Sequence, residues 1–387
     1  MRIALVRGPS LNDWELQNWL PLAKRHQLLL VGSTSTKLFT SEATLAWSIC
    51  VGELISKIPL GYFLITSLFG DPRMIWNLES LIKGYDVAVT AETRSYYSLQ
   101  AIRAKQKGFI GKVAVTVWEN IPFLGDGHPR TRRSKEIVKE EADLFLAVTH
   151  QAKKALIKEG VNPKKVTVVP MGVDQSKFKV KSSLSTRNSL KASKLKVKDK
   201  INILSVGRLV PEKGFDDLLR ACEILAKDKS LKEWFHLTIV GEGPQEEKLR
   251  EMAGYGRLPG LVSFKKVSYD QMPKVYRSAD IFVLASKPTS TWQEQYGMVL
   301  AEVASCGLAI VASKSGSNVL VTEKAAVYFY PGNFRQLYFL LIKLIVDEKL
   351  RKKKRLEAKM LAVRKFNANR VAEILESNLR DLVANYL

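Results

Sequence analysis

The sequence predicts an α/β protein built from two doubly wound halves, and three observations support this prediction. Short apolar runs alternate with amphipathic segments along most of the chain, which is typical of a parallel sheet with helices on both faces. A basic, serine-rich stretch at 177–200 interrupts this alternation, which restarts at Ile201. The length of 387 residues also suits two domains rather than one.

The first half contains six apolar runs that we expect to be strands, with helices between them. The expected strands are Ile3–Arg7, Gln27–Gly32, Asp86–Thr90, Val113–Thr116, Leu144–Val148 and Val166–Val169. We therefore place a first domain at residues 1–172 and a basic linker at 173–199.

The second half repeats the same alternation and ends in a long helical region from Asn333. The expected strands are Ile201–Gly207, His236–Gly241, Val262–Phe264, Ile281–Ser286, Leu308–Ser313 and Ala326–Tyr330. We place a second domain at residues 200–366. Ligands of doubly wound sheets bind beyond the carboxyl ends of the strands, so the cleft between the two halves is the expected site.

The charge balance is strongly basic, and it narrows the expected partners. Sixty-one Lys and Arg residues against 38 Asp and Glu residues leave a net charge of +23. This balance favours nucleic acid, an anionic membrane face or a phosphorylated substrate, although a generally basic proteome would produce it too. The three cysteines lie far apart without metal-ligand spacing, so a reducing cytosol is the expected environment.

The longest apolar stretch is 43–69, and it bears on membrane contact. It contains Glu53, Lys57 and Pro59, whereas a spanning helix needs about 20 residues with few charges. We therefore expect a buried helix pair or a membrane-dipping loop. The apolar start Met1–Arg7 is interpreted as a buried first strand rather than a signal peptide.

The strongest local motif is EQYGMVLAE (294–302), in which two carboxylates lie eight residues apart. Met298–Cys306 is the expected helix, so Gly297 lies at its amino end, where free backbone amides attract an anion. Glu294 and Glu302 can then accept hydrogen bonds from the hydroxyls of a ligand. A solvated pair of carboxylates at a helix start is the alternative interpretation.

A second motif is VGRLVPEKG (206–214), which joins a strand to a helix. Arg208 and Lys213 lie five residues apart on this loop. Two such cations above a helix N-terminus would suit a diphosphate group. Two solvated surface cations are the alternative, but both motifs follow strands of the same half, where the sheet would bring them together.

With these motifs in view, the chain resembles the retaining GT-B glycosyltransferases of family four, the "group one" transferases that use nucleotide sugars. The matching segments are AVTHQAKKALIKEGV (147–161), KVTVVPMGVDQSKF (165–178), VGRLVPEKGFDDLL (206–219), VGEGP (240–244), ADIFVLAS (279–286) and EQYGMVLAEVASCGLAIVAS (294–313). The resemblance covers 145–345 well and 1–145 more weakly. It implies two Rossmann-like domains that face each other across a cleft.

The resemblance also implies roles for the side chains of both motifs. Arg208 and Lys213 would hold the donor diphosphate and neutralise the leaving nucleotide. Glu302 would accept hydrogen bonds from the ribose hydroxyls, and Glu294 would hold a hydroxyl of the donor sugar. Glu294, Arg208 and Lys213 are therefore the expected catalytic residues.

Backbone groups complete the donor site that the resemblance implies. The amides of Gly297, Met298 and Val299 would contact the sugar or the phosphate. Gly8 matches the glycine turn after the first strand, where the backbone approaches the donor. The last helix of such folds returns to the first domain, and 367–387 is the candidate.

The chain departs from the family pattern in the first half. Many relatives carry a histidine after the strand that corresponds to 113–116, and VTVWENIPF (115–123) has none. His128 is near this position, on a loop. We expect Glu119 or Asn120 to contact the sugar instead, with Glu119 as a fourth candidate catalytic residue. The alternative is that this site binds the sugar differently.

Other acidic residues have less specific interpretations. Glu92, after the strand expected at 86–90, is a further cleft-facing candidate, and a solvated glutamate is as good an interpretation. No Asp-x-Asp pair lies in a plausible place for a metal. Arg208 and Lys213 can supply the positive charge, so we expect no metal and no cofactor besides the donor substrate.

The first half also carries basic clusters on the side expected to hold the acceptor. One cluster is Arg103, Lys105, Lys107 and Lys112, and the other is Arg130, Arg132, Arg133 and Lys135. With the apolar residues 45–69, they favour attachment to an anionic membrane and a lipid-linked acceptor, although solvated helix faces are the alternative. KLRKKKR (349–355) is interpreted as a solvated helix segment, because no aromatic RNA-binding motif accompanies it.

We therefore expect a glycosyltransferase of the hexosyltransferase type. It would move a sugar from a nucleoside diphosphate sugar to the hydroxyl of a lipid-linked or cell-surface acceptor, with retention of configuration. The expected location is the cytoplasm, with peripheral attachment to the inner face of the cell membrane. A catalytically inactive GT-B binding or scaffold protein, a basic nucleic-acid-binding protein and another GT-B activity remain the alternatives.

Overall fold

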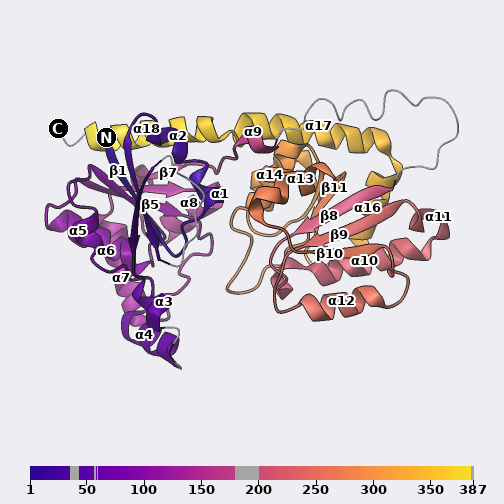
Figure 1. The fold of residues 1–387 in the computed structure, drawn as a ribbon, viewed down its shortest axis with the longest axis horizontal. Coiled ribbons are helices and arrows are strands. Elements are labelled where there is room, and N and C mark those ends of the chain that lie inside the picture. The colour runs from indigo at the N-terminus through magenta and orange to yellow at the C-terminus, as the bar shows by residue number, and fades with distance from the viewer. Residues whose placement is uncertain (35–42, 56–57, 59, 179–199, 385–387) are drawn as a thin grey trace. The chain divides into compact units, whose positions relative to one another are not determined.

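The computed structural model describes residues 1–34, 43–55, 58, 60–178 and 200–384, which form two compact units (Figure 1). The first unit is Met1–Val173 with Ala368–Leu387, and the second is Asp174–Asn367. The linker expected at 173–199 differs at its start, because Gln175 lies in a short helix of the second unit and donates to the carbonyl of Ala362 at 2.7 Å. The rest of that linker, 179–199, lies outside the described residues.

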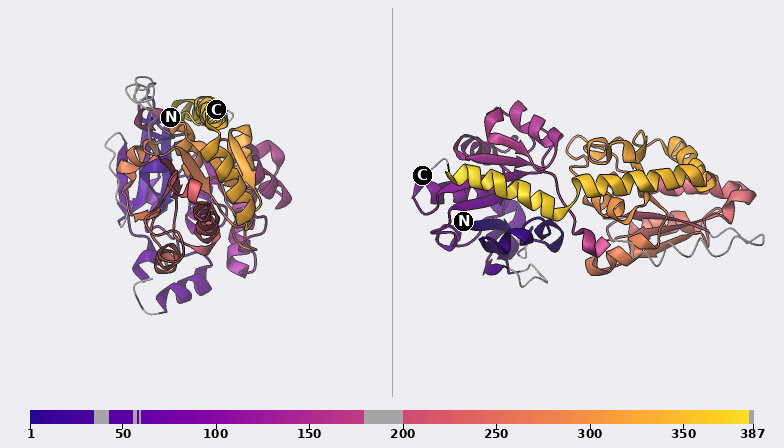
Figure 2. Two further views of the ribbon diagram at one scale, coloured as in Figure 1. Left: turned by 90° about the vertical axis from the view of Figure 1, so that its right-hand side faces the viewer. Right: turned by 90° about the horizontal axis from the view of Figure 1, so that it is seen from above.

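The first unit is a parallel sheet with helices on both faces (Figures 1 and 2). Its strands are β1 (Arg2–Gly8), β2 (Gln27–Ser33), β3 (Thr44–Ser48), β4 (Val87–Ala91), β5 (Lys112–Val117), β6 (Leu144–Ala147) and β7 (Val166–Val168). Its helices are α1 (Asp13–Leu16), α2 (Leu20–Ala23), α3 (Val51–Ile55), α4 (Gly61–Phe69), α5 (Leu78–Leu81), α6 (Tyr96–Gln106), α7 (Pro129–Glu141), α8 (His150–Lys158) and α18 (Ala368–Ala384), with a 3₁₀ turn η1 (Pro163–Lys165).

The strand order of this sheet is β3-β2-β1-β4-β5-β6-β7, and all of the pairs are parallel. Alternate residues of β1 enter different cores, with Ala4 and Val6 in one cluster and Ile3 and Leu5 in the other. This alternation explains why the strand sequences are apolar throughout. From β1 the chain adds strands first on one side of the sheet, to β3, and then on the other side, from β4 to β7. Ligands of such sheets bind at this switch point, between β1 and β4.

Helix α18 completes one of these cores, although it comes from the far end of the sequence. Val371, Leu375 and Leu379 of α18 are buried in the cluster that also contains Ile3 of β1. At the rim, Glu376 pairs with Arg25 and, at 2.9 Å, with His26. The last helix therefore belongs to the first unit, as Figure 2 also shows.

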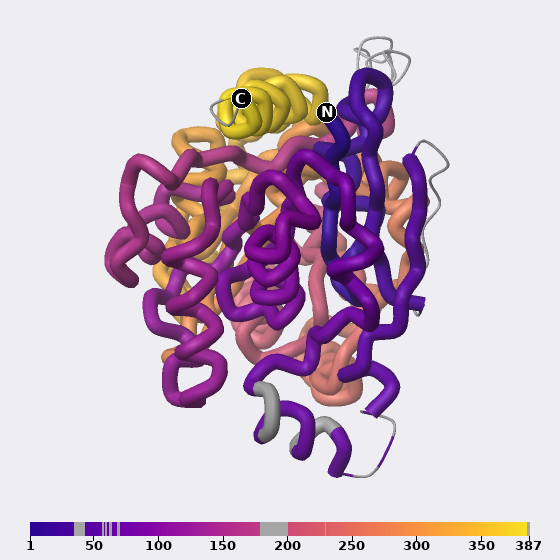
Figure 3. Tube along the Cα trace, turned by 90° about the vertical axis from the view of Figure 1, so that its left-hand side faces the viewer, coloured from indigo at the N-terminus to yellow at the C-terminus, as the bar shows by residue number. Residues whose placement is uncertain are grey.

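The apolar stretch at 43–69 forms an edge strand and a helix pair rather than one long helix. Strand β3 pairs with β2, and α3 and α4 extend beyond the end of the sheet (Figures 1 and 3). Leu54 of α3 and Leu64 of α4 are exposed whereas Ile65 is buried, so this helix pair is only partly buried. Among the residues described, no helix is long and apolar enough to cross a membrane.

The second unit repeats the arrangement with six strands in the order β10-β9-β8-β11-β12-β13, all parallel. The strands are β8 (Ile201–Val206), β9 (Phe235–Val240), β10 (Val262–Lys265), β11 (Ile281–Leu284), β12 (Ala309–Ser313) and β13 (Ala326–Phe329). The helices are α9 (Gln175–Phe178), α10 (Phe215–Lys227), α11 (Lys229–Lys232), α12 (Glu246–Gly254), α13 (Met272–Arg277), α14 (Met298–Cys306), α15 (Asn318–Thr322), α16 (Phe334–Val346) and α17 (Glu348–Lys365). Three 3₁₀ turns are η3 (Pro211–Lys213), η4 (Tyr269–Gln271) and η5 (Glu323–Ala325).

The core of the second unit joins the strands to α10 and α16. Ile203 and Val283, from neighbouring strands, share this core with Leu218 of α10 and Leu341 of α16. The order of the strands reverses between β8 and β11. The loops that follow these two strands are therefore expected to carry a ligand site.

Candidate functional site

The loops after β8 and β11 bring the two sequence motifs together. Lys213, at the end of η3, places its Nζ 2.7 Å from Oε2 of Glu294, which follows β11. Ser286, directly after β11, donates its hydroxyl to the same oxygen at 2.7 Å. Glu294 is only 7% exposed, so its carboxylate is held in one position by a cation and a hydroxyl. Burial with both partners suits a preorganised site better than a solvated surface pair.

An aromatic ring adds to the environment of Lys213. Its Nζ lies 4.9 Å from the ring centroid of Trp292, on the loop between Ser286 and Glu294. Together, the ring and the carboxylate fix the ammonium group from two sides. A fixed cation loses little entropy when a ligand arrives, which favours tight binding of an anion.

Arg208 lies on the same loop as Lys213 but in a different environment. It follows Gly207, the first residue after β8, and its side chain is exposed. No acid of the described residues lies within ion-pair distance of it, whereas Lys213 is paired. Arg208 therefore carries a positive charge that is available to a ligand at this end of the sheet.

Helix α14 places its amino end beside this cluster. Gly297 caps the helix in the left-handed conformation (φ 70°), and the amides of Met298 and Val299 follow it. The first amides of a helix have no partner within that helix, and the helix dipole places positive charge there. This end of α14 is therefore suited to a phosphate or to sugar oxygens.

Glu302 lies one turn further along α14, in a closed environment. Its two carboxylate oxygens accept hydrogen bonds from the hydroxyls of Tyr269 at 2.8 Å and of Tyr276 at 2.5 Å. Burial raises the pKa of Glu302 to about 7, and the two tyrosine hydroxyls oppose this rise in part. The structure does not bring Glu302 into hydrogen-bond contact with Glu294, so the two carboxylates have separate surroundings.

The raised pKa of Glu302 leads to a prediction on pH. If Glu302 accepts from ribose hydroxyls, donor affinity should fall as pH falls below about 7, because the neutral acid is the weaker acceptor. The fall should approach about tenfold per pH unit. Isothermal titration with a nucleotide sugar at several pH values measures it. Glu302→Gln should remove the dependence, and an unchanged slope in that variant would contradict the assignment.

Folding stability should respond to the same group with the opposite sign. The folded state raises this pKa from 4.5, so the stabilising contribution of the neutral acid is complete at low pH. It should be lost as pH rises through about 7, where the folded protein must ionise a buried group. Urea unfolding of Glu302→Gln should lack this component.

Gly316 supports the backbone of Glu294, and this contact also gives a prediction. A Cβ at Gly316 (φ +51°) would lie 2.0 Å from the carbonyl oxygen of Glu294. Gly316→Ala should therefore displace Glu294, and it should lower both stability and activity. Gly332→Ala is the matched control, because Gly332 also has a positive φ (+79°) but open space around it.

The control should lose only the cost of the left-handed backbone, about 1–2 kcal/mol. Denaturant unfolding should give a clearly larger loss for Gly316→Ala. Equal losses in the two variants would show that the contact with Glu294 has no effect on stability.

In the first unit, Gly8 ends β1 in the left-handed conformation (φ +54°). Beside it, Arg7 is fully buried, and its guanidinium contacts Glu15 at 2.8 Å, the carbonyl of Val89 at 3.0 Å and the hydroxyl of Thr116 at 3.0 Å. Arg7 thus ties together the carboxyl ends of β1, β4 and β5. This role was not predicted, because its partners lie up to 109 residues away in the sequence.

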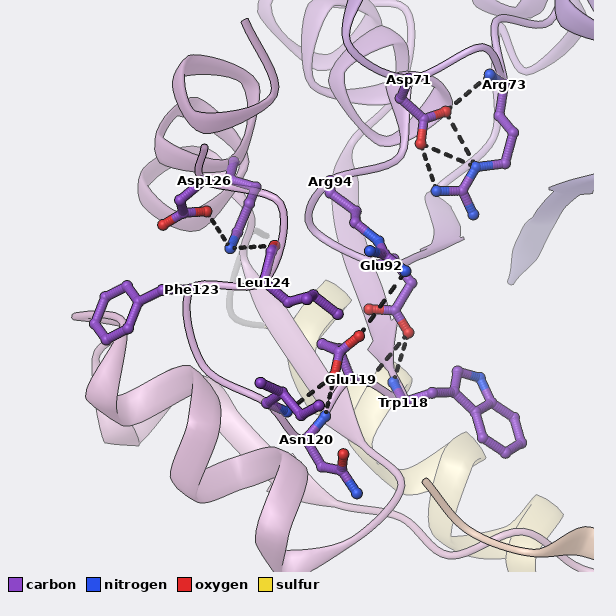
Figure 4. A network of polar contacts seen from close by, with 12 residues as sticks. Asp71, Arg73, Glu92, Arg94, Trp118, Glu119, Asn120, Phe123, Leu124 and Asp126 are labelled. Carbon is purple, nitrogen blue, oxygen red and sulfur yellow. Dashed lines mark hydrogen bonds and ion pairs between the residues drawn. The ribbon is translucent and has the colours of Figure 1, made fainter. Parts of the chain in front are cut away.

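Glu92 and Glu119 build the loop that follows β5 (Figure 4). The carboxylate of Glu92 accepts from the amides of Trp118 at 2.8 Å and Glu119 at 3.2 Å. Burial raises the pKa of Glu92, which has a left-handed backbone (φ 63°) rare for a glutamate. The carboxylate of Glu119 accepts from the amides of Asn120 and Ile121, both at 2.9 Å. The structure therefore shows both carboxylates in hydrogen bonds that shape the loop.

A cavity of about 560 Å³ opens in the first unit beside this loop. It is lined by Pro9, Cys50, Gly52, Glu53, Thr66, Gly70, Asp71, Pro72, Arg73, Arg94, Gly125, His128 and Thr131. Arg73 is bound to Asp71 through both its amide, at 2.8 Å, and its guanidinium, at 3.0 Å. Arg94 extends between this pair and Glu119, which its guanidinium approaches at 3.8 Å (Figure 4).

His128 belongs to this cavity, although it lies outside the position where the family histidine was expected. It precedes α7, and its Nδ1 has no hydrogen-bond partner among the described residues. Asp71, Arg73 and Arg94 were not predicted as site residues. Each comes from a loop that only the fold brings to this cavity. Of the residues that line the cavity, His128 was the one that the sequence had indicated, because it lies near the expected histidine position.

Two protein-family models match this chain. A model described as "Glycosyltransferase Family 4" matches residues 22–177, and one described as "Glycosyl transferases group 1" matches residues 186–360. An uncharacterized glycosyltransferase of Methanocaldococcus jannaschii, MJ1069, is 26% identical over 219 residues, which are 56% of this chain and 53% of that protein. D-inositol 3-phosphate glycosyltransferase 2 of Catenulispora acidiphila is 32% identical over 204 residues, 50% of this chain and 45% of that protein. The chain thus spans about half the length of these curated relatives.

Solved structures share the fold over nearly the whole chain. Anabaena Alr3699/HepE in complex with UDP-glucose has a TM-score of 0.73 at 17% identity, and 98% of this chain and 100% of that chain are covered. Sucrose-phosphate synthase from Thermosynechococcus elongatus has a TM-score of 0.70 at 16% identity, with 99% of both chains covered. This likeness and the two parallel sheets confirm the GT-B fold. With both family models matched in chain order, the chain belongs to the group 1 glycosyltransferases.

Proposed function

We propose that this chain transfers a sugar from a nucleoside diphosphate sugar to an acceptor hydroxyl, with retention of the anomeric configuration. The observation that carries the proposal is the ion pair between Lys213 and the buried Glu294, next to the exposed Arg208. Two cations and the amino end of α14 suit a diphosphate, and a buried carboxylate suits a sugar hydroxyl. The solved complex of Anabaena Alr3699/HepE with UDP-glucose supports a nucleotide sugar as the donor.

In the proposed reaction, the bond between the anomeric carbon and the diphosphate oxygen breaks. A bond to the acceptor oxygen forms on the same face of the sugar, and the proton of the acceptor hydroxyl passes to the departing diphosphate. Arg208, Lys213 and the amides of α14 stabilise the negative charge that develops on the leaving group. Since these groups supply the positive charge, the proposal includes no metal or cofactor. Glu294 is already bonded to Lys213 and Ser286, which suits a positioning role better than nucleophilic attack.

The cavity of the first unit is the proposed acceptor site. Its lining combines the carboxylates of Glu53 and Asp71 with Arg73, Arg94 and His128. Such a mixture of acceptors and donors suits a sugar with several hydroxyls. Glu119 remains part of this proposed site, because its carboxylate lies 3.8 Å from the guanidinium of Arg94, which lines the cavity.

The acceptor is proposed to be lipid-linked. Glu53 of α3 and Thr66 of α4 line the cavity, whereas Leu54 and Leu64 on the same two helices are 57% and 54% exposed. A polar head group in the cavity would thus continue into a chain that contacts the apolar surface of α3 and α4. Such an acceptor places the protein at the inner face of the cell membrane.

The basic clusters expected to support this attachment need correction. Lys105 and Lys112 both pair with Asp143, at 3.1 and 3.5 Å, and Lys107 pairs with Glu79 at 2.5 Å. Lys135 is buried between Asp126 and Glu159, so it belongs to the interior. Partners distant in the sequence neutralise these lysines, which the local sequence does not reveal.

The remaining members are Arg103, which is exposed on α6 and donates to the hydroxyl of Tyr96 at 3.2 Å, and Arg130, Arg132 and Arg133, which are exposed at the start of α7. Thr131 of the same turn lies against Gly70, which ends α4. Of the two basic clusters, Arg130, Arg132 and Arg133 are therefore the residues next to the apolar helix pair of α3 and α4. In the proposed membrane contact, these three arginines take the place of the two full clusters.

A panel of nucleoside diphosphate sugars tests the donor assignment. The true donor at 100 times its dissociation constant should stabilise the protein by about 2.7 kcal/mol in a thermal-shift assay. Arg208→Ala should reduce the shift while leaving the melting temperature of the free protein unchanged. A panel without any shift would refute the donor assignment.

The acceptor assignment is tested by comparing two acceptors with the same sugar head group, one lipid-linked and one water-soluble. Leu54→Ser with Leu64→Ser should raise KM for the lipid-linked acceptor only, and Tyr255→Ser, another exposed site in the second unit, is the control. Equal KM changes for both acceptors would reject the lipid contact. Nuclear magnetic resonance of the product decides whether the configuration is retained.

A further inference from the structure

Helix α17 of the second unit exposes a row of apolar side chains. Leu356, Met360 and Val363 are 60%, 64% and 64% exposed, and their spacing of four and three residues places them on one face. The opposite face contains Ala358, Leu361 and Ala362, which are buried in the second unit. The outward row therefore makes no contribution to the core.

Helix α15 contacts the end of α17 but does not extend this row. The Nζ of Lys365 at the end of α17 donates to the carbonyl of Leu320 at 2.7 Å, which places the two helices side by side. Val319 and Leu320 are 40% and 44% exposed. Lys365 lies half a turn away from Leu356 on α17, so this contact does not place Val319 and Leu320 in the row. The row itself consists of three large apolar side chains next to one another, whereas single exposed ones are normal.

Helix α17 is also the most basic element of the described chain. Its sequence, EKLRKKKRLEAKMLAVRK, has nine Lys or Arg residues and two Glu. Both acids are paired, Glu348 with Lys352 and Glu357 with Lys354, each at 2.8 Å. Lys349, Lys353 and Lys359 are exposed, without an acid within ion-pair distance among the residues described. Their charge is thus available to a partner.

We propose that the outward face of α17 lies on an anionic lipid surface. A helix with an apolar row between lysines binds in the plane of a membrane, with its apolar side chains at the acyl boundary and its cations at the head groups. A nucleic acid would satisfy the lysines, but it would leave Leu356, Met360 and Val363 in water. The surface is independent of the donor and acceptor assignments, because none of these residues belongs to either proposed site.

A fluorescent probe on Met360 tests the contact directly. The native cysteines, Cys50, Cys222 and Cys306, are buried, so Met360→Cys can be labelled selectively with an environment-sensitive dye. With vesicles containing phosphatidylglycerol, the dye should shift to shorter wavelength and be quenched by nitroxide lipids. The same dye at Lys248→Cys should not respond, because α12 lies on the opposite side of this unit (Figure 1). An equal response at both sites, or none at Met360→Cys, would overturn the proposal.

Two groups of variants of the full chain then separate charge from apolar contact. Lys349, Lys353 and Lys359→Gln should weaken partition into anionic vesicles on the order of 100-fold, since each lysine near such a surface contributes about fivefold. Leu356, Met360 and Val363→Gln should weaken partition at unchanged charge. Lys227, Lys248 and Lys274→Gln are the matched control, with the same charge removed from exposed positions elsewhere in the unit.

Vesicle sedimentation at two salt concentrations measures all three groups, and circular dichroism confirms that each variant is folded. If both α17 variants partition like the control, the proposal is wrong. If the α17 lysines matter only for binding to a single-stranded RNA probe in a mobility assay, the surface belongs to nucleic acid and the proposal is also wrong.

Discussion

Replacing Lys213 or Arg208 with alanine is expected to slow sugar transfer on the order of 10²–10³-fold, as removal of one preorganised oxyanion donor does. Each side chain would stabilise the leaving diphosphate more strongly than the bound donor, because negative charge develops during bond cleavage. The effect should therefore appear in kcat as well as in kcat/KM. Near-normal turnover in both variants would defeat the donor-site assignment.

The structure predicts that the two variants differ in stability. Lys213→Ala removes the cation at 2.7 Å from the buried Glu294, and loss of a buried partner costs on the order of 3 kcal/mol. Arg208 is exposed and has no acid partner among the described residues, so Arg208→Ala should unfold at the temperature of the unmodified protein. The Arg208 variant is therefore the cleaner test of catalysis, and thermal unfolding of both variants checks this difference.

The sequence predicted twelve of the strands of the described chain, and most of these strands are buried on both faces, although the edge strands β7 and β10 are only partly buried. Their apolar runs, such as Ile281–Leu284, stand out against the helices around them. Strand β3 was not predicted. It lies at the edge of its sheet and is half-exposed, with Trp47 in contact with solvent, so its composition merges with the apolar helices that follow.

The candidate site also has a part that the sequence predicted and a part that it did not. Arg208, Lys213, Glu294 and Gly297 lie in continuous motifs, so the sequence could indicate them and the fold then brought Lys213 to Glu294. The cavity of the first unit has no such motif. Its side chains come from loops and helices that are distant in the sequence, and only the folded structure shows that they share one cavity.

Charge was the least predictable feature. Lys105 and Lys107 are basic in the sequence, but Asp143 and Glu79 pair with them from 38 and 28 residues away. KLRKKKR (349–355) was expected to be a plain solvated segment, and only its continuation along α17 shows the exposed row from Leu356 to Val363. Local sequence reports how much charge is present, whereas the fold decides how much of it remains unpaired.

Glu294→Ala is expected to lower turnover on the order of 10²–10³-fold, more through kcat than through donor affinity, because Glu294 is proposed to hold the reacting sugar. Glu302→Ala should do the reverse, with weaker binding of every donor that carries a ribose. Isothermal titration with the donor and single-turnover kinetics separate the two effects. A Glu294 variant with weaker donor binding but normal single-turnover rates would contradict the assignment.

A double-mutant cycle between Lys213 and Glu294 shows whether the pair acts as one unit. The two side chains are in direct contact at 2.7 Å, so the loss in Lys213→Ala/Glu294→Ala should be smaller than the sum of the single losses, with a coupling of about 0.5–3 kcal/mol. The double variant should also recover part of the melting temperature lost in Lys213→Ala, since no buried carboxylate is left without its cation. Arg208 with Glu294 is the control cycle, because the structure gives these two no ion pair, and its stability effects should add. Additive losses for Lys213 and Glu294, in both rate and melting temperature, would mean that the ion pair does not organise the donor site.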